Sequence, residues 1–149
     1  MAEVYFYHLT RSPIEQVLPD LLDKCLGKKW RVCVRGTDRD RLDWLDGRIW
    51  LYRDDWFLPH GLAGGPNDRH QPVLLTTGEA SNLADVLMLV DGARPDVAEL
   101  GDYERVMLVF DGHNDTAVAN AREDWKAVTT AQVPAQYWAQ EDRGWVKKA

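Results

Sequence analysis

Short apolar runs alternate along the chain with longer stretches in which apolar residues recur every three or four positions. The runs predict strands, because they are rich in β-branched and aromatic residues and are too short for helices. They cover residues 4–9, 31–35, 72–77, 84–90 and 105–110. Near the C-terminus, residues 136–140 predict a last strand or a docked extended segment. Strands that are apolar throughout are typical of a sheet that is covered on both faces.

The first stretch with helical periodicity begins directly after the first strand. Ser12 and Glu15 predict a helix with Ser12 as its N-cap and Pro13 at its first position. Gly27 is the expected end of this helix. Pro19 lies inside the stretch and predicts a kink or a later helix start.

Two more helices are predicted from the same signals. Thr37 and Asp40 repeat the combination of cap and acid before a helix with apolar residues at positions 42, 45 and 49. The Asn-Asp-Thr sequence at 114–116 caps a well-marked helix that extends to about Thr129. A short helix is expected over residues 96–100, and a long loop over the Gly- and Pro-rich residues 52–72.

Strands that alternate with amphipathic helices predict an α/β sandwich with a mainly parallel sheet. The order of the strands in the sheet does not follow from the pattern. The chain has 149 residues and carries no internal repeat or linker. This length predicts a single domain over residues 1–149, large enough to bury a sizeable core.

Composition and charge narrow the classes of function. The 18 Lys and Arg and 24 Asp and Glu residues give a formal charge of −6, which argues against broad nucleic-acid binding through phosphates. Protein partners and small molecules stay open, and the seven Trp residues suit either a core or a protein interface. Cys25 and Cys33 are interpreted as reduced core thiols of a cytoplasmic protein. No secretory signal or membrane-spanning run is apparent in the sequence.

Sequence motifs for catalysis, metals or cofactors are weak. The Gly-rich residues 61–65 are interpreted as a loop, and the four His residues are too scattered to predict a metal site, so no cofactor is expected. Asp91, Asp111 and His113 follow the ends of predicted strands, where α/β enzymes place catalytic side chains. A nucleotide-binding or hydrolytic enzyme is therefore the alternative to a binding protein. Turn formation and helix capping explain the same residues and are favoured.

One face of the last predicted helix combines an indole with two cations. Arg122, Trp125 and Lys126 stand at i, i+3 and i+4 and so share that face. Such a face suits the terminal carboxylate and last side chain of a peptide, with Arg122 binding the carboxylate as a fork. Residues 120–149 carry five Lys or Arg and four Asp or Glu residues, so this end of the chain is faintly basic. The alternative is that Trp125 covers the core while the charges are solvated.

A second candidate surface lies at residues 49–52 and 54–60. These residues include four aromatic and three aliphatic side chains, which is more than one helix face needs. The sequence is compatible with two roles for these side chains, a patch that binds a partner protein and ordinary core packing.

Several segments together resemble the chi subunit of bacterial DNA polymerase III, an accessory protein of the clamp-loader complex. The VYFYHL, RVCVRG and ADVLMLV strands fit the pattern of that family. The combination LD…IW…FLPHG over residues 42–61 is distinctive. Residues 121–126, with the sequence AREDWK, match the Ala-Arg-x-x-aromatic-Lys helix of the family. The resemblance covers most of the chain in order and in length.

This resemblance implies a Rossmann-like three-layer fold and a non-catalytic adaptor. It implies that the basic helix face binds the acidic C-terminal tail of the single-stranded-DNA-binding protein, which ends in an apolar residue. Arg122 would hold the tail carboxylate, Trp125 would pack against the last side chain, and Lys126 would meet the acidic residues.

The same resemblance implies a second protein partner, a psi-like clamp-loader subunit. The surface that receives it would include Trp50, Phe57 and Pro59. The resemblance thus favours protein partners over direct strong binding of nucleic acid.

Overall fold

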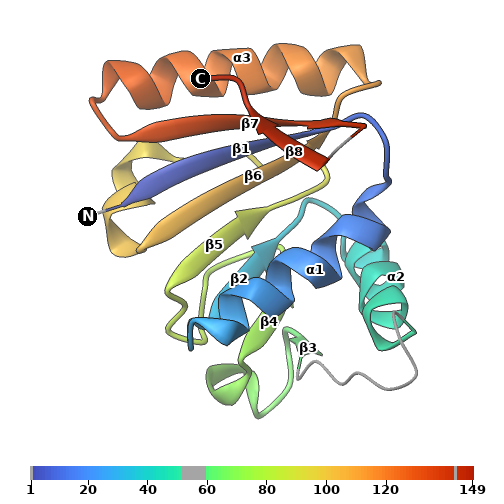
Figure 1. Ribbon diagram of the computed structural model, residues 1–149. Helices are drawn as coiled ribbons and strands as arrows, with labels where there is room; N and C mark the ends of the chain where they lie inside the picture. Colours follow the sequence, from blue (N-terminus) through green and yellow to red (C-terminus); the bar gives the residue numbers. More distant parts are fainter. Residues whose placement is uncertain (1, 52–59, 143) are drawn as a thin grey trace.

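A single sheet with helices on both faces forms the centre of the protein (Figure 1). The computed structural model describes residues 2–51, 60–142 and 144–149. The strands are β1 Glu3–Leu9, β2 Val32–Arg35, β3 Gly61–Leu62, β4 Val73–Thr76, β5 Val86–Leu89, β6 Arg105–Asp111, β7 Ala135–Glu141 and β8 Gly144–Lys147. The helices are α1 Ile14–Gly27, α2 Arg39–Trp50 and α3 Asp115–Thr130, with two 3-10 turns, η1 Asp68–His70 and η2 Val97–Asp102.

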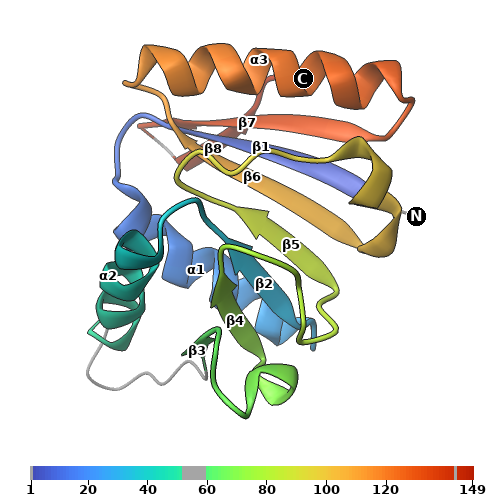
Figure 2. The same cartoon turned by 180° about the vertical axis from the view of Figure 1, so that it is seen from behind.

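The predicted α/β sandwich with a mainly parallel sheet is confirmed. The strand order is β3-β4-β2-β5-β6-β1-β7-β8, and β8 alone among the described strands runs antiparallel to its neighbour. Helices α1 and α2 cover one face of the sheet, while α3 and η2 cover the other (Figures 1 and 2). Among the helices of the described residues, none combines the length and the apolar character that a membrane span requires.

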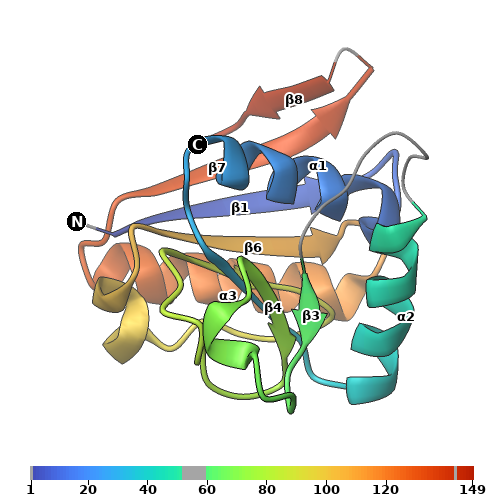
Figure 3. The ribbon, with the colours of Figure 1, turned by 90° about the horizontal axis from the view of Figure 1, so that it is seen from below.

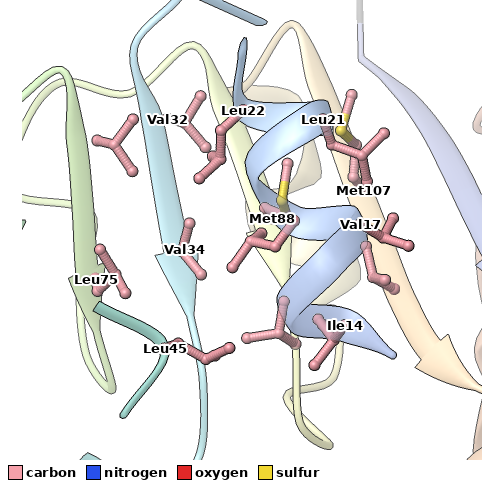
Figure 4. Close-up of a cluster of buried hydrophobic side chains, with 14 of the residues drawn as sticks. Ile14, Val17, Leu21, Leu22, Val32, Val34, Leu45, Leu75, Met88 and Met107 are labelled. Carbon is pink, nitrogen blue, oxygen red and sulfur yellow. The ribbon is translucent and has the colours of Figure 1, made fainter. Parts of the chain in front are cut away.

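Two apolar clusters, one on each face of the sheet, form the core. Figure 4 shows the cluster beneath α1, where Val17 and Leu21 point toward Met88 and Met107 of the sheet. The second cluster lies between the sheet and α3. Both cysteines are buried free thiols, as predicted, and burial raises the pKa of each to about 11.

The predicted N-caps of the first two helices are wrong, because each helix begins one residue later than its predicted cap requires. The N-cap of α1 is Pro13, with no side-chain hydrogen bond, while the backbone N–H of Ser12 donates to Gln140 Oε1. The helix begins at Ile14 and continues through Pro19.

The second of these helices, α2, is capped one residue later than predicted. The Thr37 hydroxyl donates to the backbone carbonyl of Asp91 at 2.8 Å. Asp38 is the N-cap instead, and its carboxylate accepts the Asp40 N–H at 3.0 Å. The third cap is confirmed, because Asn114 accepts the Ala117 N–H.

Two strands differ from the sequence prediction. Residues 61–62, expected in a loop, form β3. The glycines that follow remain in a loop, where the N–H groups of Gly64 and Gly65 donate to the carboxylate of Asp68 at 2.8 and 3.0 Å. The predicted C-terminal strand is confirmed as β7, but β8 was not expected. Its four residues are too few for a clear alternation of apolar and polar positions.

Candidate functional site

Helix α3 is held in one orientation by an ion pair on its inner side. Ala121 and Val128 are buried against the sheet, and the carboxylate of Asp124 is buried between them. Arg94, from the segment after β5, donates to Asp124 Oδ1 from Nη2 at 2.7 Å and from Nε at 3.1 Å. These two charge-assisted hydrogen bonds to one carboxylate help to fix which helix face remains on the outside.

The structure brings Arg122, Trp125 and Lys126 together on that outer part of α3. Trp125 is half-buried, whereas Arg122 and Lys126 are exposed. Across residues 2–51, 60–142 and 144–149, neither cation forms a hydrogen bond or an ion pair. Both charges are therefore available to a ligand, and the indole between them presents one side to it.

The inner side of the Trp125 indole rests on an aromatic cluster from β1 and β7. Its ring lies 5.3 Å from the Phe6 ring at 70° and 5.9 Å from the Tyr137 ring at 83°, both edge-on. Tyr137 also stacks against Phe6 at 6.2 Å and meets the ring of Phe110 at 6.1 Å. Edge-on packing against these two rings holds the indole in place.

His8 completes this cluster beneath the basic helix face. Its Nδ1 lies 2.7 Å from the Tyr137 hydroxyl, and its ring is 5.0 Å from that of Phe110. Burial lowers the pKa of His8, and the nearby charges of His113 and Arg122 lower it further. Burial raises the pKa of Tyr137, an effect that Arg122 opposes. The Arg122 charge therefore acts on both polar groups of the cluster.

Sequence reasoning missed His8, Phe110 and Tyr137 as neighbours of the predicted site. Tyr137 and His8 are 129 positions apart in sequence. The only available signal was the alternation in β1, which places Phe6 and His8 on one face of the sheet.

The alternative site residues at the strand ends are engaged in contacts that hold loops. Asp91 pairs with the guanidinium of Arg41 at 2.9 Å. Asp111 accepts the His113 N–H at 2.9 Å, and the His113 ring nitrogen Nε2 lies 2.9 Å from the carbonyl of Thr10. These residues line a crevice of about 780 Å³ at the carboxyl ends of the strands. Their hydrogen bonds fit the turn-forming interpretation better than the catalytic one.

The same crevice contains the turn that binds phosphate in many α/β proteins. Here the backbone N–H groups of Thr10, Arg11 and Ser12 all donate to Gln140 Oε1, at 3.1, 3.0 and 3.1 Å. A side chain of the protein itself thus occupies the place of a phosphate oxygen. Within the described residues, no group of three or more His, Cys, Asp or Glu side chains could hold a metal ion.

The second candidate surface is seen only in part. Phe57 and Pro59 lie outside the described residues. Trp50 is 48% exposed and Leu51 77% exposed at the end of α2. The buried ring of His60 lies 4.3 Å from the Trp50 ring, and its Nε2 lies 3.0 Å from Asp46 Oδ1. Burial raises the pKa of Asp46, an effect that the neighbouring His60 opposes.

Fold and site define the class of protein as a three-layer α/β fold with a mainly parallel sheet and an exposed basic and aromatic helix face. A family model described as "DNA polymerase III chi subunit, HolC" matches residues 1–136. The chain belongs to this family of DNA polymerase III subunits.

Two curated relatives carry the same family name. A "Probable DNA polymerase III subunit chi" from Rickettsia prowazekii is 24% identical over 110 residues, covering 74% of this chain and 66% of the relative. A "DNA polymerase III subunit chi" from Pseudomonas aeruginosa is 35% identical over 74 residues, covering 49% of this chain and 51% of the relative. Each match thus spans less than two thirds of the relative's own length.

Proposed function

We propose that this protein is a non-catalytic adaptor of the DNA polymerase III clamp loader, acting in the cytoplasm during DNA replication. Its basic face on α3 would bind the acidic C-terminal tail of the single-stranded-DNA-binding protein. The observation that carries this proposal is the half-buried indole of Trp125 between two exposed cations, Arg122 and Lys126, that have no ion-pair partner among the described residues.

Each group in this face suits one part of such a tail. The Arg122 guanidinium presents two parallel N–H donors, which match the two oxygens of a terminal carboxylate. The Trp125 ring, supported edge-on by Phe6 and Tyr137, offers a rigid apolar surface for the last side chain of the tail. Lys126, one helical turn beyond Arg122, is placed for a preceding acidic residue.

The test is a titration of the purified protein with a peptide that copies the acidic tail, measured by calorimetry at low salt. We expect binding that weakens with salt and that falls about tenfold or more in Arg122→Ala, because a charge-assisted fork is removed. A second peptide that lacks the last residue should bind much more weakly.

Arg69→Ala is the matched control, since Arg69 is exposed on η1, away from α3, and its loss changes the net charge equally. Unchanged binding by Arg122→Ala, or an equal loss in Arg69→Ala, would overturn the assignment of the tail site. Circular dichroism of each variant separates lost binding from lost folding.

We also propose that the surface at the end of α2, with Trp50, Phe57 and Pro59, receives a psi-like subunit. The exposed Trp50 and Leu51 side chains support this, because adjacent exposed apolar residues are typical of protein interfaces. Co-expression with a candidate psi subunit tests it. Trp50→Ala should reduce recovery of the complex, and undiminished recovery would contradict the proposal.

A further inference from the structure

A pocket of about 400 Å³ lies on the face of the sheet opposite the Arg122 site. Helix α1 forms one wall, the β7–β8 hairpin forms the other, and β1 and β6 form the floor. Figure 3 shows β7 and β8 lying beside α1 on the same side of β1. In the described part of the chain, α3 covers only the opposite face of this outer end of the sheet.

Aromatic side chains from β1, β7, β8 and the turn before β2 line the pocket. Tyr5 and Tyr7 rise from β1, with the Tyr7 ring 5.1 Å from the Trp145 ring of β8 at 73°. Trp138 of β7 is half-buried, and its indole N–H donates to Gln136 Oε1 at 3.1 Å. With its polar end paired and its ring only partly buried, Trp138 offers an oriented apolar face to the pocket.

Cations surround these rings. Lys28 Nζ lies 4.8 Å from the centre of the Trp30 ring, and the Arg105 guanidinium lies 4.1 Å from that of Tyr5. Lys24 also lines the pocket. On β8, Lys147 is paired in register with Trp138 and so stands on the same face.

The positive charge of Arg105 is only weakly neutralised by carboxylates of the protein. The nearest carboxylate to its guanidinium is that of Glu3, at 3.9 Å, which is a long contact for an ion pair. Its buried Nε has no hydrogen-bond partner among the described residues. A chain of net charge −6 therefore presents a locally basic aromatic pocket.

We propose that this pocket binds a short acidic peptide segment of a partner protein, with one bulky apolar side chain inserted between Tyr5, Trp138 and Trp145. The cations fit the acidic flanks of such a segment. A single compact pocket on an acidic protein suits a ligand with few charges, whereas single-stranded nucleic acid needs a basic groove that follows many phosphates.

This site differs from the proposed tail site in position and in chemistry. Trp138 and Trp145 lie beyond residues 1–136, the part that the family model matches. A ligand here needs no free terminal carboxylate, because the cations surround the pocket rather than forming a fork at one end of it. The two sites therefore respond to different peptides and different variants.

The test uses the ¹⁵N-labelled protein and the blocked peptide acetyl-Asp-Glu-Phe-Asp-Glu-amide, which has no terminal carboxylate, followed by NMR. We expect the indole N–H signals of Trp138 and Trp145 to shift on titration. The double variant Lys24→Glu with Lys28→Glu should weaken binding about tenfold or more. Both lysines are exposed, so the variant keeps its core.

Lys29→Glu, next to the pocket but not lining it, reverses one charge; it is the control for each of the two lysine reversals and should change binding much less. Arg122→Ala should leave this binding unchanged, even if it abolishes binding of the acidic tail. The proposal is overturned if the two indole signals do not shift at millimolar peptide, or if the double lysine variant binds equally well. It is also overturned if an oligothymidine shifts these signals while the acidic peptide does not.

Discussion

The ion pair between Arg94 and Asp124 should contribute more to stability than any exposed pair of the protein, and Arg94→Ala tests this. The Asp124 side chain is 8% exposed, so its charge is left buried and unpaired when the guanidinium is removed. Removing one partner of a fully buried pair costs about 3–5 kcal/mol. The Arg94 side chain is 43% exposed, and water can therefore partly replace it. We expect a loss of about 2 kcal/mol.

The assay is urea unfolding, followed by circular dichroism at neutral pH. The midpoint should fall while the slope of free energy against urea stays constant. Glu123→Gln is the control, because Glu123 is 71% exposed and meets the same guanidinium at 3.2 Å; its loss should cost about 0.5 kcal/mol or less. Arg94→Ala combined with Asp124→Asn should cost less than the two single losses added together. A loss of less than about 0.5 kcal/mol in Arg94→Ala would refute the reasoning.

Two further predictions concern the cluster beneath α3. Gly112→Ala places a Cβ 2.2 Å from the His8 ring and 2.6 Å from the Leu9 carbonyl oxygen, and should lower the free energy of unfolding by about 2 kcal/mol or more in the same assay. Gly101→Ala, whose Cβ meets nothing within 4 Å, should change it little, and equal effects would contradict this account. Burial lowers the pKa of His8 below its ordinary value of 6.5, so the folded state disfavours the protonated ring. Stability should therefore fall as the pH drops below 6.5 and through the lowered pKa, and His8→Phe should lessen that fall; an unchanged pH dependence would show that His8 does not cause it.

Local signals predicted the elements of this fold well, and tertiary contacts decided their ends. The prediction of Asn114 as a cap was correct because its side-chain oxygen accepts an N–H of the helix that it caps. Ser12 is not the cap of α1, because that helix begins one residue later and has Pro13 as its N-cap. The predicted cap at Thr37 failed because its hydroxyl donates to the carbonyl of Asp91, which lies far away in sequence. A capping signature cannot reveal such a competing partner.

The candidate site was predictable only as far as local sequence signals determine it. The three residues on α3 share a face through helix geometry alone, so their spacing was enough to group them. The support beneath Trp125 depends on β7 pairing in parallel with β1, which no local pattern encodes. Phe6 was therefore expected in a strand, but its contact with Trp125 and Tyr137 was not.

The β1–β7 pair connects the two proposed binding sites without giving them a common side chain. Alternation along β1 sends Phe6 and His8 toward α3, and sends Tyr5 and Tyr7 toward α1. Parallel pairing places Tyr137 opposite Phe6. A shift of this register by one residue would exchange the two faces and remove both aromatic surfaces together. Side-chain variants should therefore impair one site at a time, whereas weakening the β1–β7 pairing should impair both.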